Sequence, residues 1–228
     1  MTGVQTCALP IYAVAVAELT LGLALALSRA IVNRDSSTRA GEWNRGAGSE
    51  ISGKTWGLLG FGATGRATAK LLSGFTDSIL AYDPFAKTID GVTLTSLDEV
   101  LKKSDVLSIH LPATAETIGL LNANKLALMK KSAILVNVGR GEVINESDLE
   151  SALRNQTIAG AALDVRAQEP PKDMRFTDLE NVILTPHIAG ITKESQAAIN
   201  RVLVNEIECA LTGQPQRYAV GSVKQAKP

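Results

Sequence analysis

Three polar side chains of this chain each come shortly after an apolar run that is typical of a buried strand. The side chains are Arg140, Glu169 and His187, and the runs before them are 133–138, 158–163 and 181–184. An arginine can bind a carboxylate with two parallel hydrogen bonds. A histidine can donate a proton to a carbonyl oxygen while hydride reaches its carbon, and a carboxylate on the other ring nitrogen fixes the tautomer. Together the residue types predict a site for proton transfer next to an anion.

Each of the three has a structural alternative when it is taken singly. Arg140 stands between glycines and could cap a turn, Glu169 before two prolines could be a solvated loop acid, and a lone histidine near a strand end is more often structural. The joint arrangement favours chemistry, because the carboxyl ends of parallel strands meet at one sheet edge. The other histidine, His110, also ends an expected strand, and we interpret it as a cofactor-side or supporting residue.

A glycine-rich turn earlier in the chain predicts a nucleotide site. Gly60, Gly62 and Gly65 form a GxGxxG pattern between an apolar strand and a helical stretch that opens with Ala63 and Thr64. The first glycine allows the tight turn, the second lets the backbone approach a pyrophosphate, and the third lets helix and strand pack closely. The phosphates then meet free N–H groups at the helix N-terminus.

An acidic residue at the end of the next strand indicates which dinucleotide is bound. Asp83 follows the run 78–82, close to the offset of about 20 residues expected for a group that holds the adenosine ribose. Its charge would repel a 2′-phosphate, and no arginine follows it directly, so the sequence predicts NAD. Lys87 is near enough to leave NADP as an alternative.

Strand and helix patterns alternate along most of the chain. The expected strands are 55–60, 78–82, 92–94, 105–109, 133–138, 158–163 and 181–184, and the expected helices after the first strand are 64–73, 96–103, 122–128, 146–154 and 192–212. Continuous apolar strands are typical of a parallel sheet that is buried on both faces. The alternation predicts an α/β fold with a doubly wound parallel sheet, a Rossmann-like domain. Residues 33–53 are polar and contain glycines, so we expect a loop there.

Size and composition allow one or two domains and disfavour several classes of protein. Lys plus Arg and Asp plus Glu are 23 each, without a basic block that would predict nucleic-acid binding. Cys7 and Cys209 offer no disulfide framework, which fits a reducing cytoplasm. The apolar run 12–27 contains Glu18 and is shorter than the roughly 20 residues of a membrane span, so we expect a buried helix there and no membrane partner. No metal site is predicted.

Several motifs, in this order, resemble the D-isomer-specific 2-hydroxyacid dehydrogenase family over residues 13–215. They are Gly60-Phe-Gly-Ala-Thr-Gly, Tyr82-Asp-Pro, His110-Leu-Pro-Ala-Thr, Asn137-Val-Gly-Arg-Gly-Glu, Ala162-Leu-Asp-Val, Glu169-Pro and Pro186-His-Ile-Ala-Gly. The resemblance implies NAD as cofactor, a small 2-hydroxy or 2-oxo acid as substrate, and Arg140, Glu169 and His187 as the catalytic set. It also implies that Asp164 contacts the nicotinamide carboxamide. The implied cofactor site comprises Gly60, Gly62, Ala63, Thr64, Gly65, Asp83, Pro112, Val138, Asp164, His187 and Gly190.

The chain departs from this family at two places. Residues 1–11 resemble a translated sequencing-adapter oligonucleotide, and the family's first substrate-domain segment is absent. We therefore expect a foreign segment over 1–11, a crossover helix over 12–30, the NAD-binding domain over 31–190, and a return helix and tail toward the substrate domain over 191–228. The resemblance implies a cytoplasmic homodimer for the complete protein, and the chain itself is interpreted as an incomplete fragment that still binds NAD. The second departure is Arg166-Ala167, where the family usually carries an aromatic and an acidic residue.

A second class of protein resembles the same pattern. NAD-responsive transcriptional corepressors share the fold, keep the cofactor site and often keep the three catalytic residue types. A regulatory protein that binds NAD without turnover is therefore the alternative hypothesis. Reduction of glyoxylate or hydroxypyruvate with NADH would distinguish the two.

Overall fold

The computed structural model describes residues 10–87 and 91–215 of the 228-residue chain. Most of the segment expected to be foreign, with Cys7, lies outside the described residues, and so does the tail beyond residue 215.

Seven parallel strands form one sheet in the order β3-β2-β1-β4-β5-β6-β7. Their bounds are β1 Trp56–Leu59, β2 Ile79–Tyr82, β3 Thr93–Leu94, β4 Val106–Ile109, β5 Ile134–Asn137, β6 Gly160–Leu163 and β7 Val182–Leu184. Leu59 pairs with Ile109, and Ile109 pairs with Asn137, so the carboxyl ends of the central strands are level. The predicted doubly wound sheet is confirmed, and its order reverses between β1 and β4, where such folds bind ligands.

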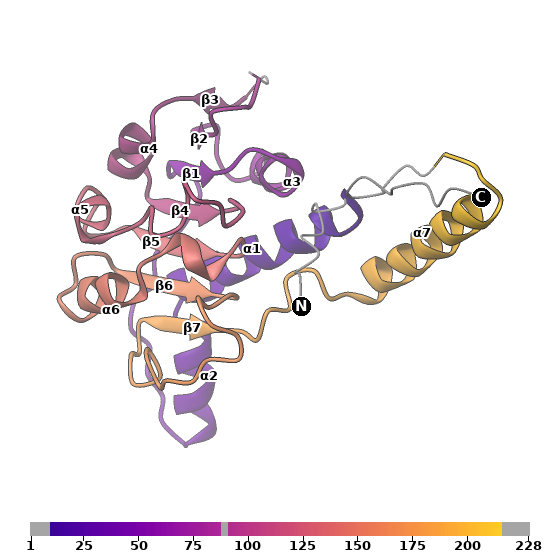
Figure 1. Cartoon of the computed structure of the whole chain (residues 1–228). Coiled ribbons are helices and arrows are strands. Elements are labelled where there is room, and N and C mark those ends of the chain that lie inside the picture. The colour runs from indigo at the N-terminus through magenta and orange to yellow at the C-terminus, as the bar shows by residue number, and fades with distance from the viewer. Residues whose placement is uncertain (1–9, 88–90, 216–228) are drawn as a thin grey trace.

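Helices cover both faces of the sheet (Figure 1). Their bounds are α1 Ala13–Ser28, α2 Ile31–Arg39, α3 Ala63–Leu72, α4 Leu97–Lys103, α5 Ala123–Leu126, α6 Glu146–Arg154 and α7 Lys193–Leu211, with 3-10 turns at Pro10–Tyr12 and Gly141–Val143. Alternate strand residues point to opposite faces, so Leu135 joins an apolar layer with α4 and α6 whereas Val136 joins a second layer with α1 and α3. The strand ends are thus held between two packed layers.

The apolar helix α1 packs against α3 and the strands β5 and β6. Ala17 and Ala24 are fully buried, whereas Glu18 is exposed, as expected for a helix covered by protein. Among the described residues, no single helix is long and apolar enough to cross a bilayer. The helices α1 and α2 meet that test of length and composition only as a pair, bent by 60°.

The loop expected over 33–53 is wrong in its first part, because α2 continues to Arg39. Ala30 has a left-handed backbone with φ of 48° and turns the chain from α1 into this helix. The side chain of Asn33 then ties the helix to the carbonyl of Glu180 at 2.7 Å. None of its residues is buried, so α2 carries no apolar stripe that hydrophobic periodicity could reveal.

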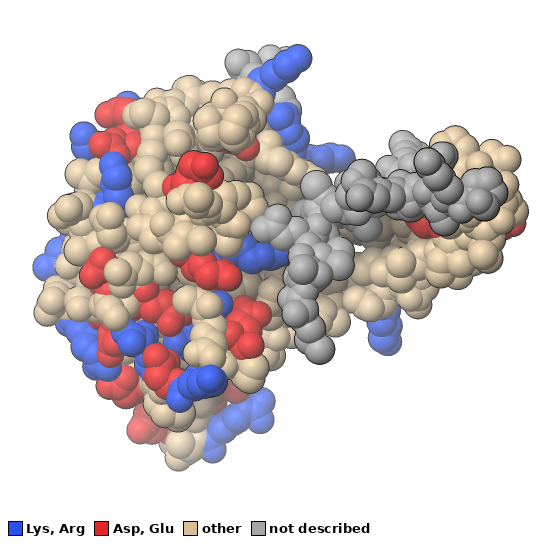
Figure 2. All heavy atoms as spheres, in the orientation of Figure 1, with Lys and Arg blue, Asp and Glu red and all other residues tan. Residues whose placement is uncertain are grey.

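The last helix, α7, extends away from the sheet (Figure 1). Its start is fixed by a capping box, in which Thr192 and Ser195 each accept the other's backbone N–H. Four apolar side chains on it are more than half exposed: Leu203, Val204, Ile207 and Leu211. On the visible face in Figure 2, few charged residues appear on this helix, whereas acidic and basic residues intermingle over the region of α6.

Candidate active site

The glycine turn after β1 is held by close backbone packing. Gly60 has φ of 93°, and a Cβ on it would lie 2.9 Å from the carbonyl carbon of His110. A Cβ on Gly65 would lie 2.2 Å from the carbonyl oxygen of Gly60. Both positions therefore require glycine. A Cβ on Gly62 would instead meet nothing within 4 Å, so the outer side of the turn is open to a ligand.

The N-terminus of α3, directly after this turn, suits an anion. The helix begins at Ala63 with Gly62 as its N-cap, and no side chain caps it by a hydrogen bond. Both residues are exposed, and Thr64 is partly exposed. The first N–H groups of an uncapped helix and its dipole favour phosphate. These residues therefore fit the pyrophosphate of a dinucleotide.

Asp83, which directly follows β2, holds the glycine turn. Its Oδ2 accepts the N–H of Phe61 and its Oδ1 accepts the N–H of Phe85, both at 2.8 Å. A carboxylate can accept about four hydrogen bonds, so this one retains capacity for ribose hydroxyls. The link to Phe61 is a structural role that the sequence did not indicate. Lys87 is exposed nearby in sequence.

A buried carboxylate at the end of β6 organises the turn that carries His187. Asp164 is 1% exposed and accepts hydrogen bonds from Thr185 Oγ1 at 2.6 Å, Ile188 N at 2.9 Å and Ala189 N at 2.8 Å. The N–H of His187 donates to the Asp164 carbonyl at 2.8 Å. His187 itself has φ of 55°, an uncommon left-handed conformation for a non-glycine residue, so this clamp sustains an unfavourable backbone.

Sequence reasoning missed Thr185 in this clamp. The signal available was a hydroxyl residue directly before the Pro-His pair. That signal gains meaning only when the fold brings the turn next to Asp164.

The structure brings Glu169 and His187 into contact. Glu169 Oε2 lies 2.6 Å from His187 Nδ1, and the two side chains are 36% and 48% exposed. The other carboxylate oxygen accepts the N–H of Arg166 at 2.9 Å. Because Nδ1 faces a carboxylate it carries a hydrogen, and Nε2 is the ring nitrogen left to exchange a proton with a ligand.

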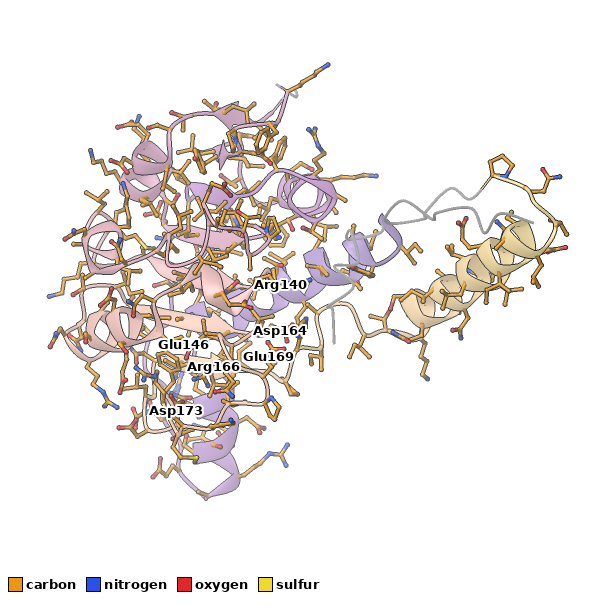
Figure 3. All side chains as sticks on the ribbon, viewed as in Figure 1. Arg140, Glu146, Asp164, Arg166, Glu169 and Asp173 are labelled. Carbon is orange, nitrogen blue, oxygen red and sulfur yellow. The ribbon has the colours of Figure 1, made fainter. Side chains whose placement is uncertain are left out.

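Arg140 lies at the same sheet edge without bonding to this pair. Its Nη1 donates to the carbonyl of Gly139 at 2.8 Å. The turn is fixed by Asn137, whose side chain binds the Gly139 N–H and the Arg140 carbonyl, each at 3.1 Å. Figure 3 shows Arg140 at the strand ends beside Asp164. Its exposed guanidinium is therefore available to an incoming anion.

His110 follows β4, and its backbone packs against Gly60 of the glycine turn. Ser108 Oγ accepts the indole N–H of Trp56 at 2.9 Å and lies 3.0 Å from His110 Nε2. The other ring nitrogen, Nδ1, is buried and has no hydrogen-bond partner in the described part of the chain. Burial lowers the pKa of His110 to about 3, so this ring is neutral near pH 7.

The remaining cofactor-side candidates lie along this edge. Pro112 is exposed three residues after β4, and its carbonyl accepts the hydroxyl of Thr117 at 2.6 Å. Val138 is buried directly after β5. Gly190 follows the Asp164 clamp, and its carbonyl accepts the hydroxyl of Ser195 at 2.6 Å.

Two cavities lie at opposite edges of the sheet. One, of about 420 Å³, adjoins Glu169 and His187 and is otherwise lined mainly by prolines and leucines. The other, of about 370 Å³, lies at the amino ends of the strands near Lys54 and Asp105. Open α/β sheets bind ligands at the carboxyl edge, so the first cavity belongs to the candidate site. Across residues 10–87 and 91–215, no group of three or more His, Cys, Asp or Glu could hold a metal ion.

Known proteins share this sequence and architecture. Glyoxylate reductase of Thermofilum pendens is 43% identical over 212 residues, which cover 88% of this chain and 62% of that enzyme. Glycerate dehydrogenase of Methylorubrum extorquens is 40% identical over 212 residues, covering 88% of this chain and 66% of that enzyme. The chain thus spans just under two thirds of the length of these relatives.

Solved structures and a family profile agree with these relatives. The crystal structure of D-lactate dehydrogenase with NAD+ from Lactobacillus jensenii superposes with a TM-score of 0.85 at 29% identity, covering 94% of this chain and 71% of that one. The profile of the D-isomer specific 2-hydroxyacid dehydrogenase NAD binding domain matches residues 21–189. The chain therefore belongs to the D-isomer specific 2-hydroxyacid dehydrogenase family and contains its NAD-binding domain.

Proposed function

We propose that this chain supplies the cofactor-binding part of an NAD-dependent dehydrogenase that interconverts a small 2-oxo acid and its D-2-hydroxy acid. The observation that carries the proposal is the 2.6 Å contact between Glu169 and His187 at the sheet edge where the glycine turn opens. Relatives named glyoxylate reductase, glycerate dehydrogenase and D-3-phosphoglycerate dehydrogenase support substrates of the glyoxylate, hydroxypyruvate or phosphoglycerate type.

The chain's own residues supply the proton and the orientation in this reaction. Bound NADH supplies the hydride. Doubly protonated His187 donates its Nε2 proton to the carbonyl oxygen, and Glu169 at Nδ1 stabilises the charged ring. Arg140, exposed at the same edge, binds the substrate carboxylate with two hydrogen bonds. In the reverse direction, neutral His187 accepts the hydroxyl proton.

NAD is the proposed cofactor in preference to NADP. Asp83 is tied to the glycine turn through Phe61, so a 2′-phosphate near the ribose would meet a fixed negative charge. Fluorescence titration of the chain should show tighter binding of NADH than of NADPH, and Asp83→Ala should narrow the gap. The matched variant Asp77→Ala, an exposed acid before β2, should leave the preference unchanged. Equal or tighter NADPH binding by the unmodified chain would contradict this assignment.

The proposed cofactor contacts extend along the whole edge. They involve Gly60, Gly62, Ala63, Thr64, Gly65, Asp83, Pro112, Val138, Asp164, His187 and Gly190. For Asp164, the clamp uses two acceptor positions on Oδ1 and one on Oδ2. One position on Oδ2 is thus left for the nicotinamide carboxamide.

We further propose that residues 31–190 form the NAD-binding domain, and that segments 12–30 and 191–228 lead to a substrate-binding domain. The extension of α7 from the sheet and its exposed apolar side chains support this division. We also propose a cytoplasmic homodimer, since Trp43 is 80% exposed and Cys209 is a free thiol. Light scattering of the full-length gene product should give twice the chain mass, and cell fractionation should place it in the cytoplasm; a monomer at micromolar concentration would contradict the dimer.

The decisive experiment is turnover of glyoxylate and hydroxypyruvate by the full-length gene product, followed by loss of NADH absorbance. Arg140→Lys should chiefly raise KM, because a point charge replaces a two-pronged donor. Glu169→Gln should weaken reduction most at high pH, since the charge that favours the imidazolium is removed. Tight NADH binding without turnover of any small 2-oxo acid would instead favour the corepressor-like regulator.

A further inference from the structure

The side chain of Arg166 turns away from solvent although it opens an exposed loop. The loop residues 167–171 that follow it are exposed, whereas the Arg166 side chain is only 9% exposed. A guanidinium is stable in such a place only when its charge and its N–H groups are matched. Its partners therefore indicate what this loop gains from an arginine.

Two acids and an aromatic ring hold the guanidinium. Glu146, the first residue of α6, accepts hydrogen bonds from Arg166 Nε at 2.9 Å and Nη2 at 3.0 Å. Asp173 accepts a third from Nη2 at 3.3 Å. The guanidinium carbon lies 4.9 Å from the centre of the Phe176 ring. Partial burial favours the neutral form of Glu146, but the bonds from Arg166 and a backbone N–H outweigh it and hold the pKa of Glu146 below its usual value. Figure 3 shows Glu146, Arg166 and Asp173 close together below the strand ends.

The same ion pair fixes the backbone that carries Glu169. Glu146 Oε1 also accepts the N–H of Ala167 at 2.9 Å, and the N–H of Arg166 donates to Glu169 Oε1 at 2.9 Å. The other oxygen of Glu169 is the one in contact with His187. A continuous path of hydrogen bonds and backbone therefore runs from α6 to the histidine ring.

At Gly141, the turn after β5 packs against the peptide bond between Arg166 and Ala167. A Cβ on Gly141 would lie 1.9 Å from the carbonyl carbon of Arg166 and 2.3 Å from the nitrogen of Ala167. Backbone contact this close is possible only for glycine. A shift of the Arg166 backbone would therefore be felt at the neighbouring Arg140 as well as at Glu169.

We propose that Arg166 is a positioning residue, which is clamped by Glu146 and Asp173 and sets the backbone that aims Glu169 at His187. The proposal rests on the function proposed above, in which the His187 ring transfers the proton. Geometry of this kind matters because a displacement of about 1 Å in a catalytic group can cost on the order of a hundredfold in rate. Here charge pairing with Arg166 fixes the loop, so the position of the loop depends on the Glu146 carboxylate.

Nuclear magnetic resonance gives a direct test, since the chain has only two histidines. The ring signal that remains in a His110→Gln variant belongs to His187. The charged side chains that line the cavity beside this ring are Asp164, Arg166 and Glu169. In the 228-residue chain, Arg166→Met should lower the midpoint of the His187 titration toward that of a Glu169→Gln variant. An unchanged midpoint in a folded variant overturns the proposal.

Two further variants separate positioning from general loosening. Arg166→Lys keeps the charge but loses the two-pronged geometry, so the midpoint of its His187 titration should lie between those of the parent and Arg166→Met. If the methionine variant does not fold, the lysine variant provides the test in its place. Arg154→Met is the matched control. Arg154 is the last residue of α6 and binds Glu150 and Asp178, but it does not contact the Glu169 loop. A shift in this control as large as that of Arg166→Met would overturn the proposal.

Kinetics of the full-length gene product supply an independent readout. Arg166→Met should lower kcat by about 10- to 100-fold and change the Kd for NADH by less than about twofold. In a Glu169→Gln background the same substitution should add little, because the group that it positions has already lost its charge. Fully additive losses would overturn the positioning role. Lack of turnover in the unmodified protein would contradict the proposed function, whereas the magnetic resonance test of Arg166 would still stand.

Discussion

Two turns at the carboxyl edge of the sheet keep their shapes by opposite means. The glycine turn over 60–65 depends on backbone atoms that pack too closely for any side chain, with Asp83 as an additional tie. The histidine turn over 185–190 depends on one buried carboxylate, Asp164, which gathers a hydroxyl and two backbone N–H groups. The first turn is therefore sensitive to added volume, and the second is sensitive to the exchange of a single acceptor atom.

The largest expected effect comes from removing the ring that the histidine turn presents. In the full-length gene product, His187→Ala should lower kcat by roughly 10²–10⁴-fold, the usual contribution of a positioned acid or base. The Kd for NADH should change far less than kcat, because most of the proposed cofactor contacts, including the glycine turn, lie on other strands. Steady-state kinetics and fluorescence titration measure the two. Full turnover by this variant would mean that the acid lies elsewhere.

Added volume should break the glycine turn. Gly65→Ala places a Cβ 2.2 Å from a backbone oxygen, which a rigid turn cannot relieve, so we expect a loss of about 2–3 kcal/mol in the free energy of unfolding. The matched variant Gly62→Ala faces open space and should lose under about 1 kcal/mol, yet bind NADH more weakly. Urea unfolding and NADH titration check the pair. Equal stability losses would show that packing does not distinguish the two glycines.

Exchange of one acceptor atom of Asp164 should destabilise the histidine turn. Asp164→Asn keeps the volume but turns an amide N–H₂ toward a backbone N–H, which should cost about 1–3 kcal/mol in the free energy of unfolding. Thr185→Val removes only one of the three donors to this carboxylate, so a loss of about 1 kcal/mol is expected. Urea unfolding of both variants measures the difference. A smaller loss for Asp164→Asn than for Thr185→Val would contradict the role of Asp164 as the organiser of this turn.

The two turns also differ in how far the sequence could predict them. Glycine spacing after an apolar strand encodes the first turn locally, so Gly60, Gly62 and Gly65 could be assigned from the sequence. The central strands β1, β4, β5 and β6 were equally accessible, because strands buried on both faces leave continuous apolar runs. The second turn is made by Asp164 and Thr185, which are 21 residues apart and become neighbours only through the pairing of β6 with β7.

Polar contacts account for what the sequence did not predict. The helix α2 buries none of its residues, so no apolar stripe predicted it. Arg166 was recognised only as a departure from related sequences, since its partner Glu146 is 20 residues earlier in the chain. Patterns of apolar residues report burial, whereas a charge pair of this kind is defined by geometry that only the folded chain supplies.

The two histidines extend the comparison to pH, because Nδ1 of His110 is buried beside the glycine turn whereas the side chain of His187 is half exposed. Burial lowers the pKa of His110 to about 3 from its model-peptide value of 6.5. Below pH 6.5 the ring is therefore protonated in the unfolded chain but stays neutral in the folded chain. Stability should therefore fall as the pH falls through this window, by roughly 2 kcal/mol between pH 7 and pH 5 from this group alone. Urea unfolding of His110→Gln at both pH values should show a loss smaller by about that amount. The same loss in parent and variant would mean that the ring of His110 can be protonated in the folded chain.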